Sequence, residues 1–134
     1  MAHEIDFRIY FEDTDVTGIV YHANYIKYFE RGRTEALRAA FSDLSALMAA
    51  EDPCTFAVSK LEIAYKRPAR LDDIITVSTQ ITYAKAAKMV FDQKIFRGDE
   101  LLAEGTVTVA VITLDGRPRR MPEGLAKRMA ELVP

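Results

Sequence analysis

Long stretches in which apolar and polar residues alternate limit most strongly how this chain can fold. From Ile75 to Tyr83 every second residue is apolar or threonine, and the residues between are polar. The same repeat returns within residues 101–114, with Ala103, Val107 and Val111 on one face. A period of two is typical of strands with one buried face. Further strands are predicted over residues 5–11, 55–66 and 88–97, the last followed by a hairpin at Gly98-Asp99.

One long helix is predicted between the first strand and the others, because the period changes over residues 23–41. Tyr25, Phe29, Gly32 and Ala36 form one stripe, and a second stripe lies beside it: Ile26, Arg33, Leu37 and Ala40. This spacing indicates an amphipathic helix. The mid-helix glycine, Gly32, predicts that another backbone approaches this face closely. Shorter helices are expected over residues 43–50 and 123–132.

The order of these elements predicts an α+β fold in which an antiparallel sheet wraps around one long central helix. The 134 residues contain no repeat or linker, so we expect a single domain over residues 1–134. One helix cannot cover both faces of such a sheet. The sequence therefore predicts a homo-oligomer that associates through a sheet edge or face.

Composition narrows the classes of partner. The chain is 49% hydrophobic and 28% charged, with a net charge of −2, so nucleic acid is not expected as a partner. No apolar run approaches the roughly 20 residues of a membrane-spanning helix. The charged N-terminus does not resemble a signal peptide, and the single cysteine, Cys54, fits a reducing compartment. These features predict a cytoplasmic protein.

The strongest functional signal is the segment E-D-T-D-V-T-G-I-V-Y-H, residues 12–22, immediately before the long helix. It places Asp15 three residues before Gly18, and His22 at the helix start. A carboxylate here lies near unpaired backbone N–H groups and the positive end of the helix dipole. Such a pairing of an acid with an oxyanion-binding amide suits acyl transfer. The alternative is a structural role in which Asp15 accepts backbone hydrogen bonds in the turn.

The D-x-x-G-I-V-Y-H-x-x-Y core resembles the hotdog-fold acyl-CoA thioesterases of the 4-hydroxybenzoyl-CoA thioesterase type, and most closely the Tol–Pal-associated branch. Residues 61–73 and 101–112 agree with this resemblance. It implies hydrolysis of an acyl-CoA thioester, no metal or redox cofactor, and a dimer or homotetramer with active sites at subunit interfaces. An acyl carrier protein is a further possible partner.

The resemblance also implies roles for single residues. Asp15 matches the catalytic aspartate, which either attacks the thioester or activates water. The backbone N–H of His22 matches the oxyanion donor, and its ring is a candidate acid, base or water-orienting group. Gly18 is expected to form the turn. The branch has tyrosine where this chain has Phe11, which keeps open a non-catalytic reading as an acyl-CoA-binding, acyl-carrier-protein-binding or envelope-complex protein.

Substrate-binding candidates lie outside this core. Tyr21 and Tyr25 are expected chiefly to pack, with substrate contact as the alternative. Lys85 and Lys88 are the first choices for the phosphates of CoA among several cations, the others being Lys60, Lys66, Arg67 and Arg97. One cysteine and two histidines, His3 and His22, do not provide a zinc ligand set. Acyl-chain length is expected to depend on a pocket under the helix, with candidate residues Phe29, Met48, Phe56 and Met89.

Overall fold

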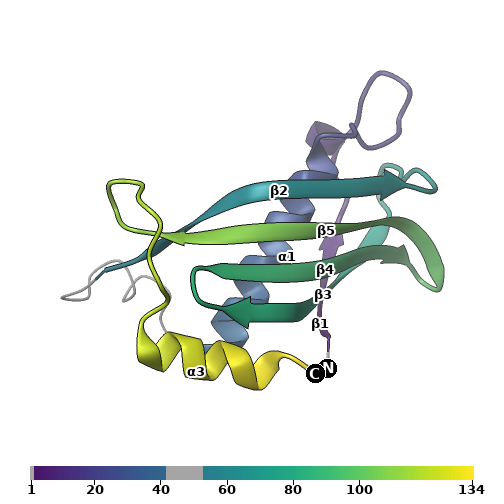
Figure 1. Cartoon of the computed structure of the whole chain (residues 1–134). Helices are drawn as coiled ribbons and strands as arrows, with labels where there is room; N and C mark the ends of the chain where they lie inside the picture. The colour runs from purple at the N-terminus through teal and green to yellow at the C-terminus, as the bar shows by residue number, and fades with distance from the viewer. Residues whose placement is uncertain (1, 42–52) are drawn as a thin grey trace.

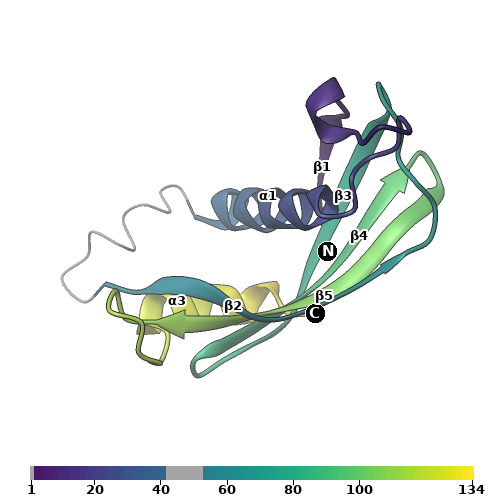
Figure 2. The ribbon, with the colours of Figure 1, turned by 90° about the horizontal axis from the view of Figure 1, so that it is seen from above.

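The computed structural model describes residues 2–41 and 53–134, and its main feature is a five-stranded antiparallel sheet. The strands are β1 (His3–Arg8), β2 (Thr55–Tyr65), β3 (Ile74–Lys85), β4 (Lys88–Arg97) and β5 (Glu100–Ile112), in the spatial order β1-β3-β4-β5-β2. The helix α1 (Asn24–Ala40) lies against the concave face of the curved sheet (Figures 1 and 2). This is the predicted hotdog arrangement. The helix expected over residues 43–50 lies outside the described residues.

The buried face of α1 confirms the main predicted stripe and corrects the second. Tyr25, Phe29 and Ala36 are buried as expected. Ile26 was predicted to be covered, but it is 39% exposed, while Tyr28 is almost fully buried instead. Arg33 and Leu37, later on the same side as Ile26, are buried. The side of α1 that carries Ile26 is therefore buried only after the first turn of the helix.

Two strand predictions also need correction. The first strand ends at Arg8 rather than at residue 11, because the backbone of Tyr10 turns into a short 3₁₀ helix, η1 (Phe11–Asp13), whose start is held by the Asp13 carboxylate. Phe11 is consequently 80% exposed. In β3 the register shifts between Ile81 and Tyr83. The extra residue turns Tyr83 outward, so it does not share the buried face of Ile81 as predicted.

Gly32 sits where α1 approaches the sheet most closely. A Cβ atom at this position would lie 2.6 Å from Val77 Cγ1 and 2.9 Å from Thr79 Oγ1. The close approach is therefore confirmed, although the neighbours are side chains of β3 and not the predicted backbone. Gln93 of β4 stabilises the same contact, since its Nε2 donates to the carbonyl of Phe29 at 2.8 Å and to Thr79 Oγ1 at 2.9 Å.

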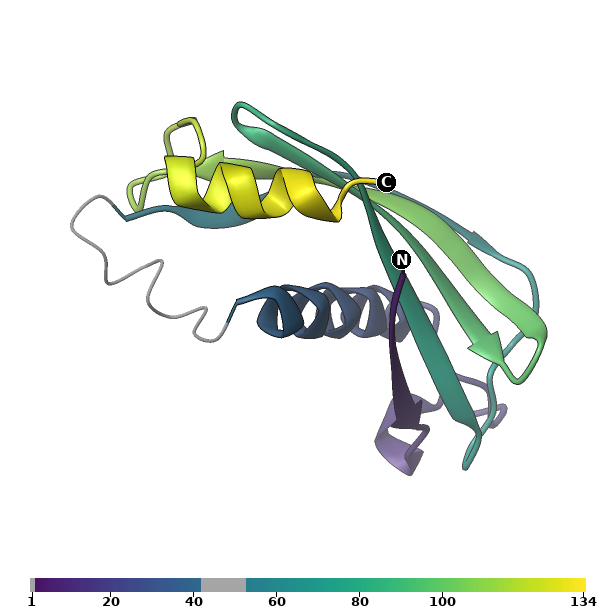
Figure 3. The same ribbon diagram turned by 90° about the horizontal axis from the view of Figure 1, so that it is seen from below.

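The C-terminal helix α3 (Glu123–Leu132) corresponds to the predicted last helix. It packs against β3 through the buried residues Leu125 and Met129 (Figure 3). The Arg128 guanidinium donates a 3.2 Å hydrogen bond to the carbonyl of Ala40 at the end of α1. Among the described residues, no helix is both long enough and apolar enough to cross a membrane.

Candidate active site

The segment between β1 and α1 forms a small hydrogen-bonded loop. The Asp15 N–H donates to Ile19 at 2.8 Å, and the Tyr21 N–H donates to Asp13 at 2.9 Å, so the two sides of the loop pair in antiparallel fashion. Gly18 occupies the turn with a φ of +83°, a left-handed conformation that glycine adopts without strain. A 2.9 Å bond from Val20 N–H to Ala69 fixes the loop to the segment before β3.

Asp15 is held in the loop by one of its two carboxylate oxygens. Oδ1 accepts hydrogen bonds from the Thr17 N–H at 2.8 Å and from Thr17 Oγ1 at 2.6 Å. These two bonds lower the pKa of Asp15, so the group is ionised at neutral pH. Oδ2 makes no hydrogen bond or ion pair with the described residues. The carboxylate is exposed to solvent in the single chain, and Thr17 gives it the structural contact expected of an Asx turn.

His22 lies two residues before the first residue of α1. Its carbonyl accepts a 2.9 Å hydrogen bond from the Tyr65 hydroxyl, while no acceptor within the described ranges is bonded to its N–H. The imidazole is exposed, with its ring centroid 4.7 Å from that of Tyr21 and 6.3 Å from that of Tyr65. The backbone N–H is therefore free to donate to a ligand, beside the positive end of the helix dipole.

An open hollow of about 290 Å³ adjoins His22. Its lining combines apolar and cationic side chains: Ile19, Val20, His22, Tyr25, Tyr65, Lys66, Arg67 and Pro68. Asp15 is not among them. Tyr25 is buried, and its hydroxyl accepts a 2.9 Å bond from the Ala69 N–H, a contact that fits the expected packing role. Tyr21 is 49% exposed and does not line the hollow.

The cations at this hollow differ from those ranked first on sequence. Lys66 and Arg67 border it, and Arg67 also forms a 3.3 Å ion pair with Glu100. Lys85 and Lys88 face each other at the β3–β4 hairpin, where Lys88 Nζ lies 5.1 Å from the centre of the Tyr83 ring. The loop that carries His22 is anchored near the start of β3, whereas the hairpin lies at the end of β3. The two ends of this 12-residue strand are up to about 36 Å apart. Within one chain they do not meet His22.

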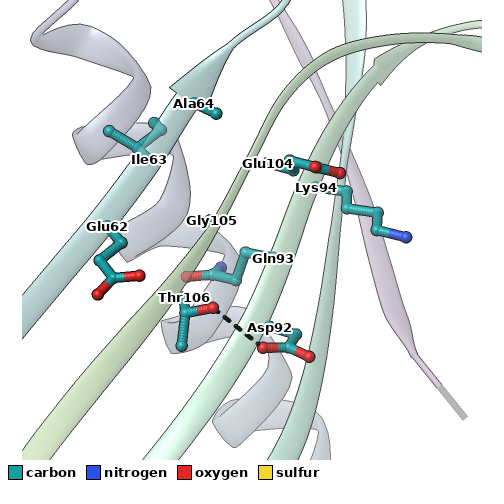
Figure 4. A pocket seen from close by; sticks show the side chains of 9 residues that line it. All are labelled: Glu62, Ile63, Ala64, Asp92, Gln93, Lys94, Glu104, Gly105 and Thr106. Atoms are coloured by element: carbon teal, nitrogen blue, oxygen red, sulfur yellow. Dashed lines mark hydrogen bonds between the residues drawn. The ribbon is translucent and has the colours of Figure 1, made fainter.

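Other hollows are less suited to the chemistry of a thioester. One, of about 480 Å³, lies over β2, β4 and β5, where charged side chains such as Glu62, Asp92 and Glu104 project away from α1 (Figure 4). A second, of about 250 Å³, lies between α1 and the sheet and includes Phe56 and Met89. Those two were acyl-pocket candidates; Phe29 is fully buried and does not line it, and Met48 lies outside the described residues.

Thr17 and Tyr65 are the site residues that sequence reasoning missed. Thr17 follows Asp15 by two residues, which is the usual spacing of an Asx turn, so this contact was available from the sequence. The contact between Tyr65 and His22 joins residues far apart in the chain, and no local pattern signals it. Among the described residues, no three His, Cys, Asp or Glu side chains gather as a metal site requires.

Comparison with known proteins gives a consistent result. The family model of the thioesterase-like superfamily matches residues 9–129. A protein named acyl-CoA thioester hydrolase YbgC, from Escherichia coli O6:H1, is 41% identical over 120 residues, which is 88% of each chain. An acyl-CoA thioesterase YbgC from Haemophilus influenzae is 41% identical over 80% of this chain and 78% of its own.

A solved structure agrees with these relatives. The crystal structure of a probable thioesterase from Bartonella henselae superimposes with a TM-score of 0.87 at 36% identity. The superposition covers 91% of this chain and 100% of that one. The match thus extends over most of the chain.

Proposed function

Because the chain belongs to the thioesterase-like superfamily, we propose that it hydrolyses an acyl-CoA thioester to the free acid and CoA. The observation that carries this proposal is the loop before α1, where an ionised carboxylate and an unbonded backbone N–H are held in one hydrogen-bonded unit. Relatives with 41% identity that are named acyl-CoA thioesterases support the same substrate class.

Asp15 is proposed to act through Oδ2, the oxygen that Thr17 leaves free. As a general base it would take a proton from water while the water oxygen attacks the thioester carbonyl. As a nucleophile it would form a mixed anhydride, which a second step hydrolyses. In both routes the carbon–sulfur bond breaks and the CoA thiolate leaves and takes up a proton. The exposed, low-pKa carboxylate is compatible with either route.

The His22 N–H is proposed to stabilise the oxyanion that forms on the carbonyl. Loss of one such donor costs about 3–4 kcal/mol of transition-state stabilisation in acyl-transfer enzymes. The donor is part of the main chain, so it does not depend on the imidazole. The exposed ring remains a candidate for orienting water. Lys66 and Arg67, at the adjoining hollow, are proposed to contact the pantetheine arm or diphosphate of CoA.

A homo-oligomer, dimer or tetramer, is proposed to complete the site. Large side chains near Asp15 in the sequence are exposed in the single chain: Phe11 is 80% exposed, Val16 is 103% exposed and Tyr21 is 49% exposed. Such a group is suited to being covered by another subunit. Strand β2 also ends the sheet with an unpaired edge among the described strands. In an oligomer Lys85 and Lys88 can approach a neighbour's site, which they do not do within one chain. We place this enzyme in the cytoplasm, since its single cysteine, Cys54, fits a reducing compartment.

A thiol-release assay tests the proposal with short, long and aromatic acyl-CoA substrates. Asp15→Asn should abolish most of the turnover of the best substrate. The matched control is Asp99→Asn, which changes another exposed carboxylate, at the β4–β5 hairpin, and should leave turnover unchanged. Release that persists in Asp15→Asn would remove Asp15 from catalysis. If no substrate releases thiol, the chain is instead a binding protein for acyl-CoA or an acyl carrier protein, a reading that the absent hydroxyl at Phe11 keeps open.

A further inference from the structure

The loop that carries the proposed catalytic groups, residues 15–22 (the site loop), is held in place by residues 66–73, which join β2 to β3 (the connecting segment). Besides the bond made by the Val20 N–H, the Leu71 N–H donates to the carbonyl of Gly18 at 3.3 Å. The two stretches also form an isolated antiparallel bridge. The position of the site loop therefore depends on the position of the connecting segment.

The connecting segment contains a turn that Asp73 closes. Its carboxylate oxygen Oδ2 accepts a 2.8 Å hydrogen bond from the Arg70 N–H, and its own N–H donates to the Arg70 carbonyl at 3.1 Å. The backbone of Arg70 in turn pairs with Ile19 of the site loop. The carboxylate of Asp73 therefore stabilises the stretch of backbone against which the site loop lies.

Arg97, the last residue of β4, bonds to the connecting segment at two points. Its Nη1 donates to Asp73 Oδ2 at 2.7 Å and to the carbonyl of Pro68 at 3.2 Å. Pro68 also lines the hollow beside His22. Because the guanidinium is planar and rigid, these bonds fix both ends of the turn relative to each other and to the sheet.

Glu100 orients the Arg97 guanidinium from the other strand of the β4–β5 hairpin. The two residues face each other directly in the register of the strands. The Arg97 Nε donates to Glu100 Oε1 at 3.1 Å, and Nη2 donates to the same oxygen. Arg97, Asp73 and Glu100 are all half-buried, so water screens their interactions less than those of a fully exposed pair. The hairpin thus presents a guanidinium of fixed orientation to the connecting segment.

We propose that Arg97 is a positioning residue for the thioester hydrolysis proposed above, a function on which this inference rests. Arg97 fixes the connecting segment, and the connecting segment fixes the site loop with its carboxylate and its oxyanion donor. A displacement of such groups by about 1 Å can cost about a hundredfold in rate. Arg97 does not line the hollow beside His22, so its loss should impair the chemical step more than substrate binding.

A thiol-release assay on the full chain, with the best acyl-CoA substrate, tests this role. Arg97→Gln removes the charge and the planar fork, so we expect kcat to fall about tenfold or more while KM changes little. Arg97→Lys keeps the charge but cannot reach all three partners at once, so it should recover kcat only in part. Arg117→Gln is the matched control, because it breaks a 2.9 Å ion pair with Asp115 in the loop between β5 and α3 and should leave both quantities unchanged.

Hydrogen exchange of the full chain tests the same role without any turnover. The N–H groups of Val20 and Leu71 are bonded between the site loop and the connecting segment, so their exchange rates report on that contact. In Arg97→Gln these two amides should exchange faster than in the parent. The amides of α3, which lies far from the site loop, should exchange at the parent rate (Figure 1).

The outcomes distinguish this inference from the proposed function. Unchanged kcat in Arg97→Gln would overturn the inference even if the chain hydrolyses acyl-CoA. Faster exchange throughout the chain, α3 included, would mean that Arg97 only stabilises the fold, and would overturn it as well. If no acyl-CoA is hydrolysed, faster exchange confined to Val20 and Leu71 still shows that Arg97 holds the site loop, and only the proposed function fails. If Arg97→Gln does not fold, Glu100→Gln, which removes one partner and keeps the guanidinium, is measured in the same way.

Discussion

The Tyr65 hydroxyl, at the last residue of β2, donates a 2.9 Å hydrogen bond to the carbonyl oxygen of His22, just before α1 begins. This contact connects the edge strand to the peptide that follows the proposed oxyanion donor. Tyr25 makes a parallel connection, because its hydroxyl accepts the Ala69 N–H at 2.9 Å. Together the two contacts hold the start of the helix against the end of β2 and the segment that follows it.

Tyr65→Phe should reduce turnover more than it reduces stability. Loss of one neutral hydrogen bond costs about 1 kcal/mol of unfolding free energy, whereas a shift of the His22 peptide misaligns the oxyanion donor. In the thiol-release assay we expect a fall in kcat with little change in KM. Thermal unfolding measures the accompanying loss of stability, which should be small. Tyr83→Phe, which removes an exposed hydroxyl at the far hairpin, should leave both quantities unchanged.

Thr17→Val should move the acid limb of the activity profile to higher pH. The substitution removes the 2.6 Å bond from Oγ1 to Asp15 Oδ1 and keeps the N–H bond. Thr17 holds the pKa of Asp15 below its ordinary value, so in the parent the carboxylate loses its charge only as the pH falls through that lowered pKa. Without the hydroxyl it is protonated at a higher pH. The measurement is kcat/KM from acid to neutral pH.

Thr17→Ser is the control for that experiment, because it restores the hydroxyl without the methyl group. Its profile should coincide with that of the parent. If the valine variant lost activity equally at every pH, the role of Thr17 would be to orient Asp15 and not to set its charge.

Sequence patterns predicted most of the sheet because the long strands alternate, and β3, β4 and β5 each bury one face. The errors lie where a local contact overrides the pattern. Phe11 continues the alternation of β1, but the bond from Tyr10 N–H to Asp13 begins a turn before it. Tyr83 continues the alternation of β3, but a register shift turns it outward. In both places the alternation of residue types continues past the point where the backbone changes course, so the sequence pattern does not signal the change.

The sequence predicted the part of the candidate site whose residues lie close together along the chain. Asp15, Gly18 and His22 lie within one short loop, which backbone hydrogen bonds and a left-handed turn at Gly18 close in front of α1. The positions of the cations were not predicted: Lys66 and Arg67 border the hollow beside His22, and Lys85 and Lys88, the first choices from the sequence, do not. Their positions depend on the pairing of β2 with β5 and on the path from β2 to β3, which spacing along the chain does not specify.

Gly32→Ala should destabilise the fold although alanine favours helices. The new Cβ would lie 2.6 Å from Val77 Cγ1, and overpacking of a core costs about 1–3 kcal/mol, which outweighs the gain of about 1 kcal/mol in helix propensity. Gly124→Ala in α3 is the matched control, because nothing lies within 4 Å of its added Cβ. Chemical denaturation should show the two variants shifting in opposite directions.

Gln93→Leu should be among the most damaging substitutions outside the site. Gln93 Oε1 accepts the 3.0 Å bond from Arg33 Nη1, the one hydrogen bond of that buried guanidinium to the described residues. Burial already lowers the pKa of Arg33. Removal of Gln93 takes away the hydrogen bond of a buried charged group, a loss of about 1.5–3 kcal/mol, and also leaves the carbonyl of Phe29 without this donor.

A double-mutant cycle separates these two effects. Adding Arg33→Met to Gln93→Leu removes the unpaired charge, so it should restore part of the lost unfolding free energy. Chemical denaturation of the parent, both single variants and the double variant gives the coupling. If the double variant is as unstable as the sum of the single variants, the guanidinium is not what makes Gln93 necessary. The bond to the helix carbonyl would then be its main contribution.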